Sequence, residues 1–154
     1  MMIGILFVCT GNTCRSPMAA GVMRSLVRGA GLEGTVEVDS AGTAVRVPGQ
    51  PASPFAVEAA ARRGHDIATH RSRSLTADDL THFTHPLAMA RTHLAAMRSL
   101  ASLDLADRPR MFLIEDVADP YGGTLQDYER VLDLIEVGCA SLFEDILRDR
   151  LPAV

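Results

Sequence analysis

The segment from Cys9 to Ser16, which reads CTGNTCRS, places an arginine six residues after a thiol. It follows an apolar run and precedes a helical pattern, so its backbone N–H groups can surround an anion with a helix dipole behind them. A nucleotide-binding P-loop carries Gly-Lys-Ser/Thr here, whereas this segment starts with a cysteine. The pattern predicts a phosphate-binding loop that presents a nucleophile to phosphorus, lined by Thr10, Gly11, Asn12, Thr13 and Cys14.

Two side chains of this loop are suited to chemistry on phosphorus. A helix N-terminus and a nearby arginine can lower a thiol pKa from about 8.5 to about 3.5–7.5, so we expect Cys9 to be largely ionised. The planar guanidinium of Arg15 can hold two phosphoryl oxygens and binds them more strongly as charge develops. The alternative for Cys9 is a buried cysteine at the end of a strand, with no reaction to perform.

The remaining cysteines, histidines and arginines have plainer interpretations. Cys14 is either a small buried residue or the partner of Cys9 in a reversible disulfide, which needs Cα atoms within about 7 Å. Cys139 is predicted to be a core residue of a helix. No metal or organic cofactor is predicted, because no metal-ligand spacing links His65, His82, His85 and His93. We expect solvated side chains, able at most to attract an anionic substrate, for Arg62, Arg63, Arg71 and Arg73.

Apolar runs predict strands at residues 3–9, around Val36 and Val38, within 83–90 and at 111–114. The first run has no polar alternation, which is typical of a central strand buried on both faces of a parallel sheet. In the third, Pro86 lacks a backbone donor, so residues 87–90 are the firmer part.

Helices are predicted over residues 17–29, 54–63, 76–82, 92–100 and 125–146. Ser16-Pro17 and Ser53-Pro54 each pair an N-cap residue with proline at the first helical position. The last helix has the clearest apolar stripe, formed by Leu125, Tyr128, Leu132, Ile135, Cys139, Leu142, Phe143 and Ile146. The alternation predicts a single α/β domain over residues 1–154, a three-layer sandwich with a four-stranded parallel sheet and helices on both faces.

The composition indicates a folded protein with a mild negative charge. Of the 154 residues, 47% are hydrophobic and 22% are charged, which excludes a disordered or collagenous chain. A net charge of −4 disfavours an electrostatic clamp for nucleic acid, and no run approaches the roughly 18 apolar residues of a membrane span. With three cysteines and no signal-peptide pattern, a cytoplasmic location without nucleic-acid or membrane partners is expected.

A second motif, Asp119-Pro120-Tyr121, precedes the last predicted helix. Together with the pattern of Cys, five residues, Arg and Ser at residues 9–16, it makes the chain similar to the low molecular weight protein tyrosine phosphatases. Further matching stretches are DSAGT at residues 39–43, HRSR at 70–73 and the segment 122–135. The resemblance therefore extends over nearly the whole chain.

The resemblance implies a protein phosphatase that needs no cofactor and acts on a phosphorylated protein or peptide. Cys9 would attack phosphorus to give a cysteinyl-phosphate, while Arg15 and the loop amides hold the oxygens. Asp119 would protonate the leaving group and then accept a proton from the attacking water. The alternative for Asp119 is a turn residue ahead of the helix.

The resemblance also implies supporting roles. Ser16 would assist departure of the thiolate, and Tyr121 would flank the leaving group of the substrate. Asn12, Ser40 and His70 would form hydrogen bonds that shape the loop. For His70, an ordinary surface histidine is an equally open interpretation. No oligomeric state is predicted.

Two departures from the family concern the substrate. Thr13 occupies a position that is often isoleucine in tyrosine-specific members, and threonine there resembles the protein-arginine phosphatase branch. Phosphotyrosine and phosphoarginine therefore both remain open. The stretch 43–50 lacks the aromatic residue common in the family, so that wall of the pocket must come from Val45, Arg46 or Val47.

Two other functions remain open. A thioredoxin-coupled arsenate reductase shares this loop but needs further thiols to relay electrons, and the chain offers only Cys14 and Cys139. A non-catalytic phosphoprotein-binding module would use the same scaffold, but the presence of Cys9, Arg15 and Asp119 together argues against it.

Overall fold

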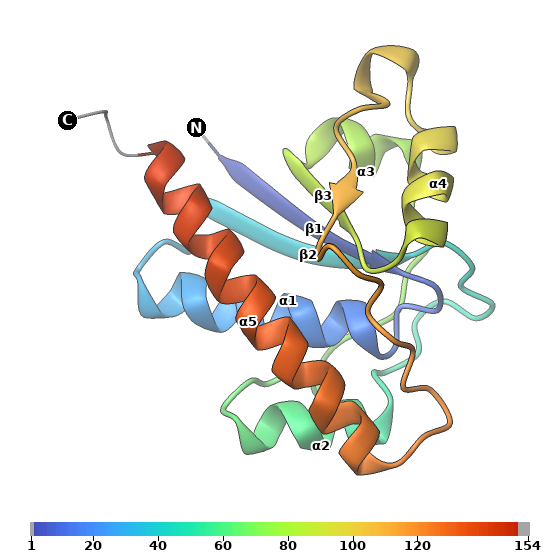
Figure 1. Ribbon diagram of the computed structural model, residues 1–154, viewed down its shortest axis with the longest axis vertical. Helices are drawn as coiled ribbons and strands as arrows, with labels where there is room; N and C mark the ends of the chain where they lie inside the picture. Colours follow the sequence, from blue (N-terminus) through green and yellow to red (C-terminus); the bar gives the residue numbers. More distant parts are fainter. Residues whose placement is uncertain (1, 151–154) are drawn as a thin grey trace.

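Strand β1 (Ile3–Cys9) occupies the middle of the sheet in the computed structural model, which describes residues 2–150 (Figure 1). Six of its seven residues are buried, as its unbroken apolar run predicts. The other elements are α1 (Arg15–Gly29), β2 (Val36–Gly42), α2 (Pro54–Arg62), α3 (Ala77–His82), β3 (His85–Ala88), α4 (Arg91–Leu100), a 3₁₀ turn (Leu103–Leu105), β4 (Arg110–Met111) and α5 (Leu125–Arg150).

The four strands form one parallel sheet in the order β2-β1-β3-β4. From β1 the chain crosses to β2 on one side, and it later returns to β3 on the other side. The connections after β1 and β3 therefore lead away from each other, which opens a crevice at the carboxyl ends of these strands. The loop at residues 10–14 lies at this crevice.

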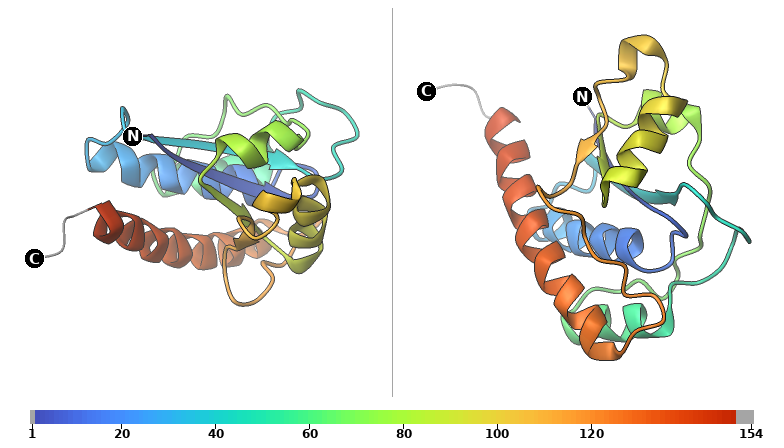
Figure 2. Two further views of the ribbon diagram at one scale, coloured as in Figure 1. Left: turned by 90° about the horizontal axis from the view of Figure 1, so that it is seen from above. Right: turned by 45° about the vertical axis from the view of Figure 1, so that its right-hand side comes forward.

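Helices cover both faces of the sheet, which confirms the predicted three-layer α/β sandwich. Helices α1, α2 and α5 pack on one face, and α3 and α4 lie on the other (Figures 1 and 2). The side chains of β1 alternate between the two cores: Phe7 points toward α1 and α5, and Leu6 and Val8 point toward α3 and α4. No helix within residues 2–150 is long and apolar enough to cross a membrane.

The fourth strand is shorter than predicted. Only Arg110 and Met111 pair with β3, whereas the apolar run suggested residues 111–114. The Phe112 amide still donates to the Ala88 carbonyl of β3 at 2.9 Å, and its ring packs edge-on against Phe7, with ring centroids 5.3 Å apart. The apolar character of this run therefore reflects burial against the core beside the sheet, and strand pairing does not require it.

Pro86 lies inside β3 despite its missing donor. The Met89 amide donates to the Val8 carbonyl, so amides at alternate positions of β3 face β1 and the nitrogen of Pro86 faces the other side. On that side, β4 pairs only with Leu87 and Ala88. Pro86 therefore breaks no ladder bond, and β3 starts earlier than its firmer predicted part.

Of the two predicted serine N-caps, Ser53 is confirmed as the N-cap of α2 with Pro54 at the first helical position, whereas Ser16 is not the N-cap of α1. Helix α1 starts at Arg15 after Cys14, so Ser16 lies inside the helix, and Ser53 precedes α2 without a side-chain capping bond. Both hydroxyls bind a thiol instead: Ser16 Oγ lies 2.9 Å from Cys9 Sγ, and Ser53 Oγ lies 2.9 Å from Cys14 Sγ. The pattern therefore located the helix starts but not the use of these hydroxyls.

Two of the arginines expected to be solvated are in ion-pair networks. Arg63 is partly buried between α2 and α5, where it pairs with Glu129, Asp133 and Glu136. Arg73 pairs with carboxylates from β2 and α3. The partners of Arg63 and the Asp39 partner of Arg73 lie far away in the sequence, and Asp79, six residues after Arg73, lies on another element, so charge spacing along the chain did not indicate these pairs.

Candidate active site

The loop between β1 and α1 forms the floor of a pocket of about 570 Å³. Cys9 lies where β1 ends, and Arg15 is the first residue of α1, so strand and helix place both on the loop. The opposite wall comes from the stretch after β2 and the segment after β4. The lining residues are Cys9, Thr10, Gly11, Thr13, Cys14, Arg15, Ala44, Val45, Arg46, Val47, Gln50, Ser72, Asp119 and Tyr121.

Cys9 lies at the bottom of the pocket and is only 2% exposed. Burial raises the pKa of its thiol, against the hydrogen bond from Ser16 and the positive charge of Arg15, which lower it. The lowered pKa expected from the helix start and the arginine is therefore wrong in direction for this structure. The reason is the depth of the strand end, which removes the sulfur from water.

Arg15 is 6% exposed and reaches across the pocket. Its Nη1 donates to the Val117 carbonyl at 2.9 Å, and its Nη2 donates to Thr10 Oγ1 at 3.3 Å. Nη2 also lies 3.7 Å from Asp119 Oδ2. The guanidinium is therefore held in position by the loop after β1 and by the segment after β4.

Asp119 lies on the segment between β4 and α5, at the rim of the pocket. Its side chain is 52% exposed, and its Oδ1 accepts a hydrogen bond from the Tyr121 amide at 3.1 Å. Tyr121 is 75% exposed and lines the pocket beside it. The structure thus brings a thiol, a guanidinium and a carboxyl group to one pocket.

Asn12 joins the supporting residues to the loop. It has φ of 58° and is fully buried, and its Nδ2 donates to Ser16 Oγ at 2.8 Å and to Ser40 Oγ at 2.9 Å. Its carbonyl accepts from His70 Nε2 at 2.7 Å, and burial lowers the pKa of His70. The structure therefore places all the predicted supporting side chains of the loop around one residue.

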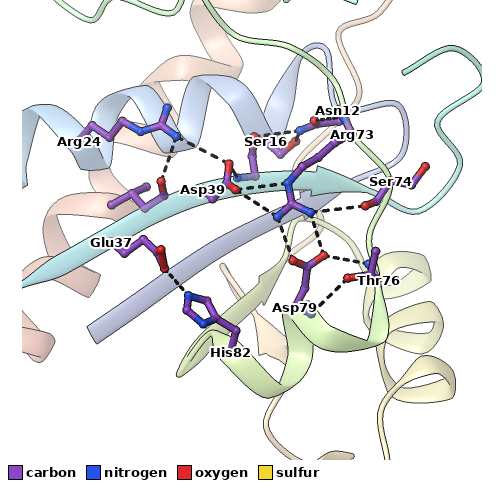
Figure 3. Close-up of polar contacts among 12 residues, drawn as sticks. Asn12, Ser16, Arg24, Glu37, Asp39, Arg73, Ser74, Thr76, Asp79 and His82 are labelled. Atoms are coloured by element: carbon purple, nitrogen blue, oxygen red, sulfur yellow. Dashed lines mark hydrogen bonds and ion pairs between the residues drawn. The ribbon is translucent and has the colours of Figure 1, made fainter. Parts of the chain in front are cut away.

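The bracing of Asn12 continues into an ion-pair network behind the loop (Figure 3). The Arg73 amide donates to Asn12 Oδ1 at 3.0 Å, while the Arg73 guanidinium binds Asp79 through both terminal nitrogens and Asp39 on β2. Asp79 also caps α3 by accepting from the Thr76 amide. This network ties the position of the loop to β2 and α3.

Cys14 and Thr13 differ in surroundings although they are neighbours. Cys14 Sγ lies 2.9 Å from Ser53 Oγ and 3.3 Å from the Tyr128 hydroxyl, and both Cys9 and Cys14 are free thiols. The Thr13 hydroxyl has no polar partner among the described residues closer than Cys14 Sγ, at 3.8 Å. Thr13 therefore lines the pocket with a hydroxyl that has only this long contact to a sulfur.

The stretch after β2 forms one wall of the pocket without an aromatic side chain, as the sequence predicts. Val45, Arg46 and Val47 all line the pocket, and none of them is aromatic. Within residues 2–150, no group of three or more His, Cys, Asp or Glu side chains is placed to hold a metal ion.

His93 was missed as a member of the site. Its Nε2 lies 2.8 Å from Thr10 Oγ1, it is 2% exposed, and its Nδ1 has no partner among the described residues. Sequence reasoning considered only a metal-ligand role for this histidine. Its position in the first turn of the helix after β3, next to the crevice, is the signal that could have found it.

Comparisons with known proteins agree with this geometry. The family model described as low molecular weight phosphotyrosine protein phosphatase matches residues 4–151. The chain is 33% identical to the low molecular weight protein-tyrosine-phosphatase YfkJ of Bacillus subtilis, over 97% of this chain and 99% of that protein. The crystal structure of YfkJ superposes with a TM-score of 0.90, covering 98% of each chain.

Arginine phosphatases are similar to a comparable degree. A protein-arginine-phosphatase of Bacillus subtilis is 35% identical over 95% of this chain and 98% of that protein. The YwlE arginine phosphatase, in a mutant whose active-site serine is phosphorylated, superposes with a TM-score of 0.88 at 32% identity, covering 96% and 98% of the two chains. From these matches, the chain belongs to the low molecular weight phosphotyrosine protein phosphatase family, whose members are cysteine-dependent phosphatases.

Proposed function

We propose that this protein removes phosphoryl groups from phosphorylated protein side chains through a phosphocysteine at Cys9. The observation that carries the proposal is the convergence of Cys9, Arg15 and Asp119 on one pocket. A phosphoryl group above Cys9 Sγ would meet the loop amides and the guanidinium, which stabilise charge on its oxygens without rearrangement. The phosphorylated active-site serine of the YwlE mutant supports a covalent step in the family.

In the first step, the Cys9 thiolate attacks phosphorus, and the bond from phosphorus to the substrate oxygen or nitrogen breaks. Asp119, acting as the general acid, gives a proton to that leaving atom. In the second step, water attacks phosphorus, its proton returns to Asp119, and the phosphorus–sulfur bond breaks to release inorganic phosphate. The Ser16 hydroxyl, 2.9 Å from Cys9 Sγ, is placed to stabilise the departing thiolate.

The availability of the thiolate is set by opposing influences. Burial raises the pKa of Cys9, while the Ser16 hydroxyl and the Arg15 charge favour the ionised form. Removal of either favourable partner therefore moves the pKa of the nucleophile further upward. This gives Ser16 and Arg15 a role in ionisation as well as in binding.

Phosphoarginine is a second candidate substrate beside phosphotyrosine, because of Thr13. Thr13 lines the pocket, and the hydrogen-bond partner of its hydroxyl in the described chain is a sulfur at 3.8 Å. Such a group can accept a hydrogen bond from the guanidinium side of phosphoarginine, whereas it has no matching donor on the ring of phosphotyrosine. The similarity to a protein-arginine-phosphatase supports this candidate.

A thioredoxin-coupled arsenate reductase fits the structure less well. A thiol relay needs a third cysteine that can reach the first two, and Cys139 is fully buried on α5. Burial also raises the pKa of its thiol far above the usual range. Cys139 therefore packs in the core, where an incoming reductant does not reach it.

The proposed function is tested by measuring phosphate release from a phosphotyrosine peptide and a phosphoarginine peptide side by side. We expect turnover by the wild-type protein and none by Cys9→Ser, because a serine hydroxyl is a far weaker nucleophile than a thiolate at neutral pH. Full activity of Cys9→Ser would overturn the mechanism. Tight peptide binding without turnover by the wild type would indicate a binding module instead.

A further inference from the structure

His93 is a buried histidine that the reaction steps above do not use. It lies in the first turn of α4, which follows β3, whereas Cys9, Thr10 and Arg15 follow β1. Its Nε2 lies 2.8 Å from Thr10 Oγ1. The contact therefore bridges the two sides of the crevice at the carboxyl ends of β1 and β3.

The direction of the hydrogen bonds follows from the donors available. An arginine side chain only donates, so Thr10 Oγ1 accepts the hydrogen bond from Arg15 Nη2 at 3.3 Å. The single proton of the Thr10 hydroxyl is then free to be donated to His93 Nε2. A neutral imidazole that accepts at Nε2 carries its proton on Nδ1.

The Nδ1 atom of His93 shows that burial of this ring costs free energy of folding. Nδ1 of His93 is buried without a hydrogen-bond partner among the described residues. Buried polar atoms without partners are rare in folded proteins, because they lose their bonds to water and gain nothing in return. The ring is thus held by its packing and by one polar contact, and that contact leads to Thr10 and from there to Arg15.

We propose that His93 is a positioning residue for Arg15 and acts through the hydroxyl of Thr10. This inference rests on the proposed phosphatase function. With its proton directed to His93, the hydroxyl turns its lone pairs toward Arg15 Nη2 and keeps the guanidinium aligned while Nη1 binds the Val117 carbonyl. The alignment matters most in the transition state, where charge on the equatorial phosphoryl oxygens is greatest.

The charges around His93 favour the neutral ring that this arrangement needs. Burial and the positive charge of Arg15 lower its pKa to about 4, and the carboxylates of Asp116 and Asp119 oppose this shift. The ring is therefore neutral at neutral pH and able to accept. A protonated ring would donate at Nε2 and would compete with Arg15 for the lone pairs of Thr10.

Two amide substitutions separate hydrogen bonding from packing. In His93→Gln the amide reaches the position of Nε2, and in His93→Asn it reaches only that of Nδ1. Using p-nitrophenyl phosphate, we expect His93→Asn to lower kcat about tenfold with little change in KM, since one hydrogen bond in the transition state is lost. We expect His93→Gln to keep at least about half of the wild-type kcat.

Thr10→Val breaks the same hydrogen-bond chain from His93 through Thr10 to Arg15 but leaves the histidine in place. The proposal can therefore be tested even if variants at position 93 do not fold. We expect a similar loss of kcat, and we expect the Thr10→Val/His93→Asn double variant to be no slower than either single variant. Inhibition by vanadate, which resembles the transition state, should weaken in parallel with kcat. Inhibition by inorganic phosphate should weaken less, whereas a merely collapsed loop would lose both equally.

The outcomes distinguish this inference from the proposed function. If the wild type hydrolyses p-nitrophenyl phosphate and Cys9→Ser does not, the phosphatase mechanism stands whatever the His93 variants do. The positioning role is overturned if His93→Asn and Thr10→Val both remain within about twofold of the wild-type kcat. It is also overturned if the double variant shows the full product of the two single losses.

Discussion

The phosphate-binding loop and the segment that carries Asp119 differ in how firmly they are held. Within the loop, Asn12 and Cys14 are buried. Asn12 donates to Ser40 on β2 and accepts from the Arg73 amide ahead of α3, and Thr10 contacts His93 on α4. The Asp119 side chain is half exposed, and Tyr121 beside it is largely exposed. The polar contacts of Asp119 are with the Tyr121 amide and with Arg15.

This difference follows from what each part does in the proposed reaction. Dipoles that stabilise a transition state lower the barrier most when they are already oriented, so the phosphate-binding loop needs many internal bonds. A general acid meets leaving groups of different shapes and then activates water, so exposure is compatible with its work. The comparison teaches that substitutions of the loop side chains that hydrogen-bond to other elements should affect folding and catalysis together, whereas those near Asp119 should affect catalysis alone.

The largest effect is expected from Asp119→Asn. Loss of a general acid lowers kcat by about 10²–10⁴-fold for a substrate with a poor leaving group, such as a phosphotyrosine peptide. The loss should be smaller for p-nitrophenyl phosphate, whose leaving group needs little protonation. The midpoint of urea unfolding should stay unchanged, because the side chain is exposed.

The matched control for this prediction is Asp116→Asn, which removes a neighbouring carboxylate of the same segment. Asp116 Oδ1 accepts hydrogen bonds from Arg91, at the start of α4, and does not line the pocket. We expect its kcat to stay within about threefold of the wild type. Equal losses in the two variants would mean that the charge of the segment matters and that a specific proton donor does not.

The next effect concerns the loop side of the comparison, at Asn12. Asn12→Gly keeps the positive φ but removes the side chain that binds Ser16, Ser40 and the Arg73 amide. We expect a loss of about 2–4 kcal/mol in the free energy of unfolding, together with a fall in kcat/KM of about 10–100-fold. Urea unfolding and steady-state kinetics on the same preparation measure the two losses.

Asn12→Ala sharpens the same test. This variant loses the same hydrogen bonds as Asn12→Gly. In addition, an alanine at a positive φ is strained where a glycine is not, so we expect the free energy of unfolding to fall by about 1 kcal/mol more. If Asn12→Gly kept wild-type stability while losing activity, the loop would resemble the Asp119 segment, and the contrast between the two parts would fail.

The sequence was sufficient to predict the fold and to single out three residues that the structure places in one pocket. The unbroken apolar run before Cys9, the Ser-Pro helix start and the long apolar stripe of α5 are local patterns, and each element formed where its pattern indicated. The convergence of Cys9, Arg15 and Asp119 was implied by two motifs that a family resemblance relates to each other. The structure brings these three residues to one pocket.

The residues that hold the loop in place, such as His93 and Arg73, could not be predicted in the same way. His93 was considered only as a metal ligand, and Arg73 was expected to be solvated, because their partners lie on other elements and the spacing of charges does not show them. The pKa of Cys9 was missed for a related reason. Motif chemistry describes the helix start and the arginine, while the depth of the sulfur depends on the whole sheet.

A smaller effect is expected at Thr13, a loop residue that lines the pocket. Thr13→Ile should lower kcat/KM for a phosphoarginine peptide about tenfold more than for a phosphotyrosine peptide, because the lost hydroxyl has a partner only on the guanidinium side. Unfolding should be unaffected, since the hydroxyl braces nothing in the loop. Equal losses for the two peptides would refute the argument from the hydroxyl.

The smallest effect is a dependence of stability on pH that belongs to the loop side of the site. The pKa of His93 is lowered to about 4 in the folded protein, while an unfolded histidine titrates near 6.5. The neutral ring therefore stabilises the fold fully above pH ~6.5, and this contribution is lost as pH falls toward the folded pKa, because the unfolded state takes up the proton first.

Between pH 7 and pH 5.5 this linkage should remove about 1 kcal/mol from the free energy of unfolding of the wild type. His93→Gln lacks the titrating ring and should lose less over the same interval, while every carboxylate of the protein remains to titrate in both proteins. Urea unfolding of the two proteins at both pH values isolates the difference. If the free energy of unfolding changed equally with pH in the two proteins, the pKa of His93 would not be lowered by the fold, and His93 would be as loosely held as Asp119.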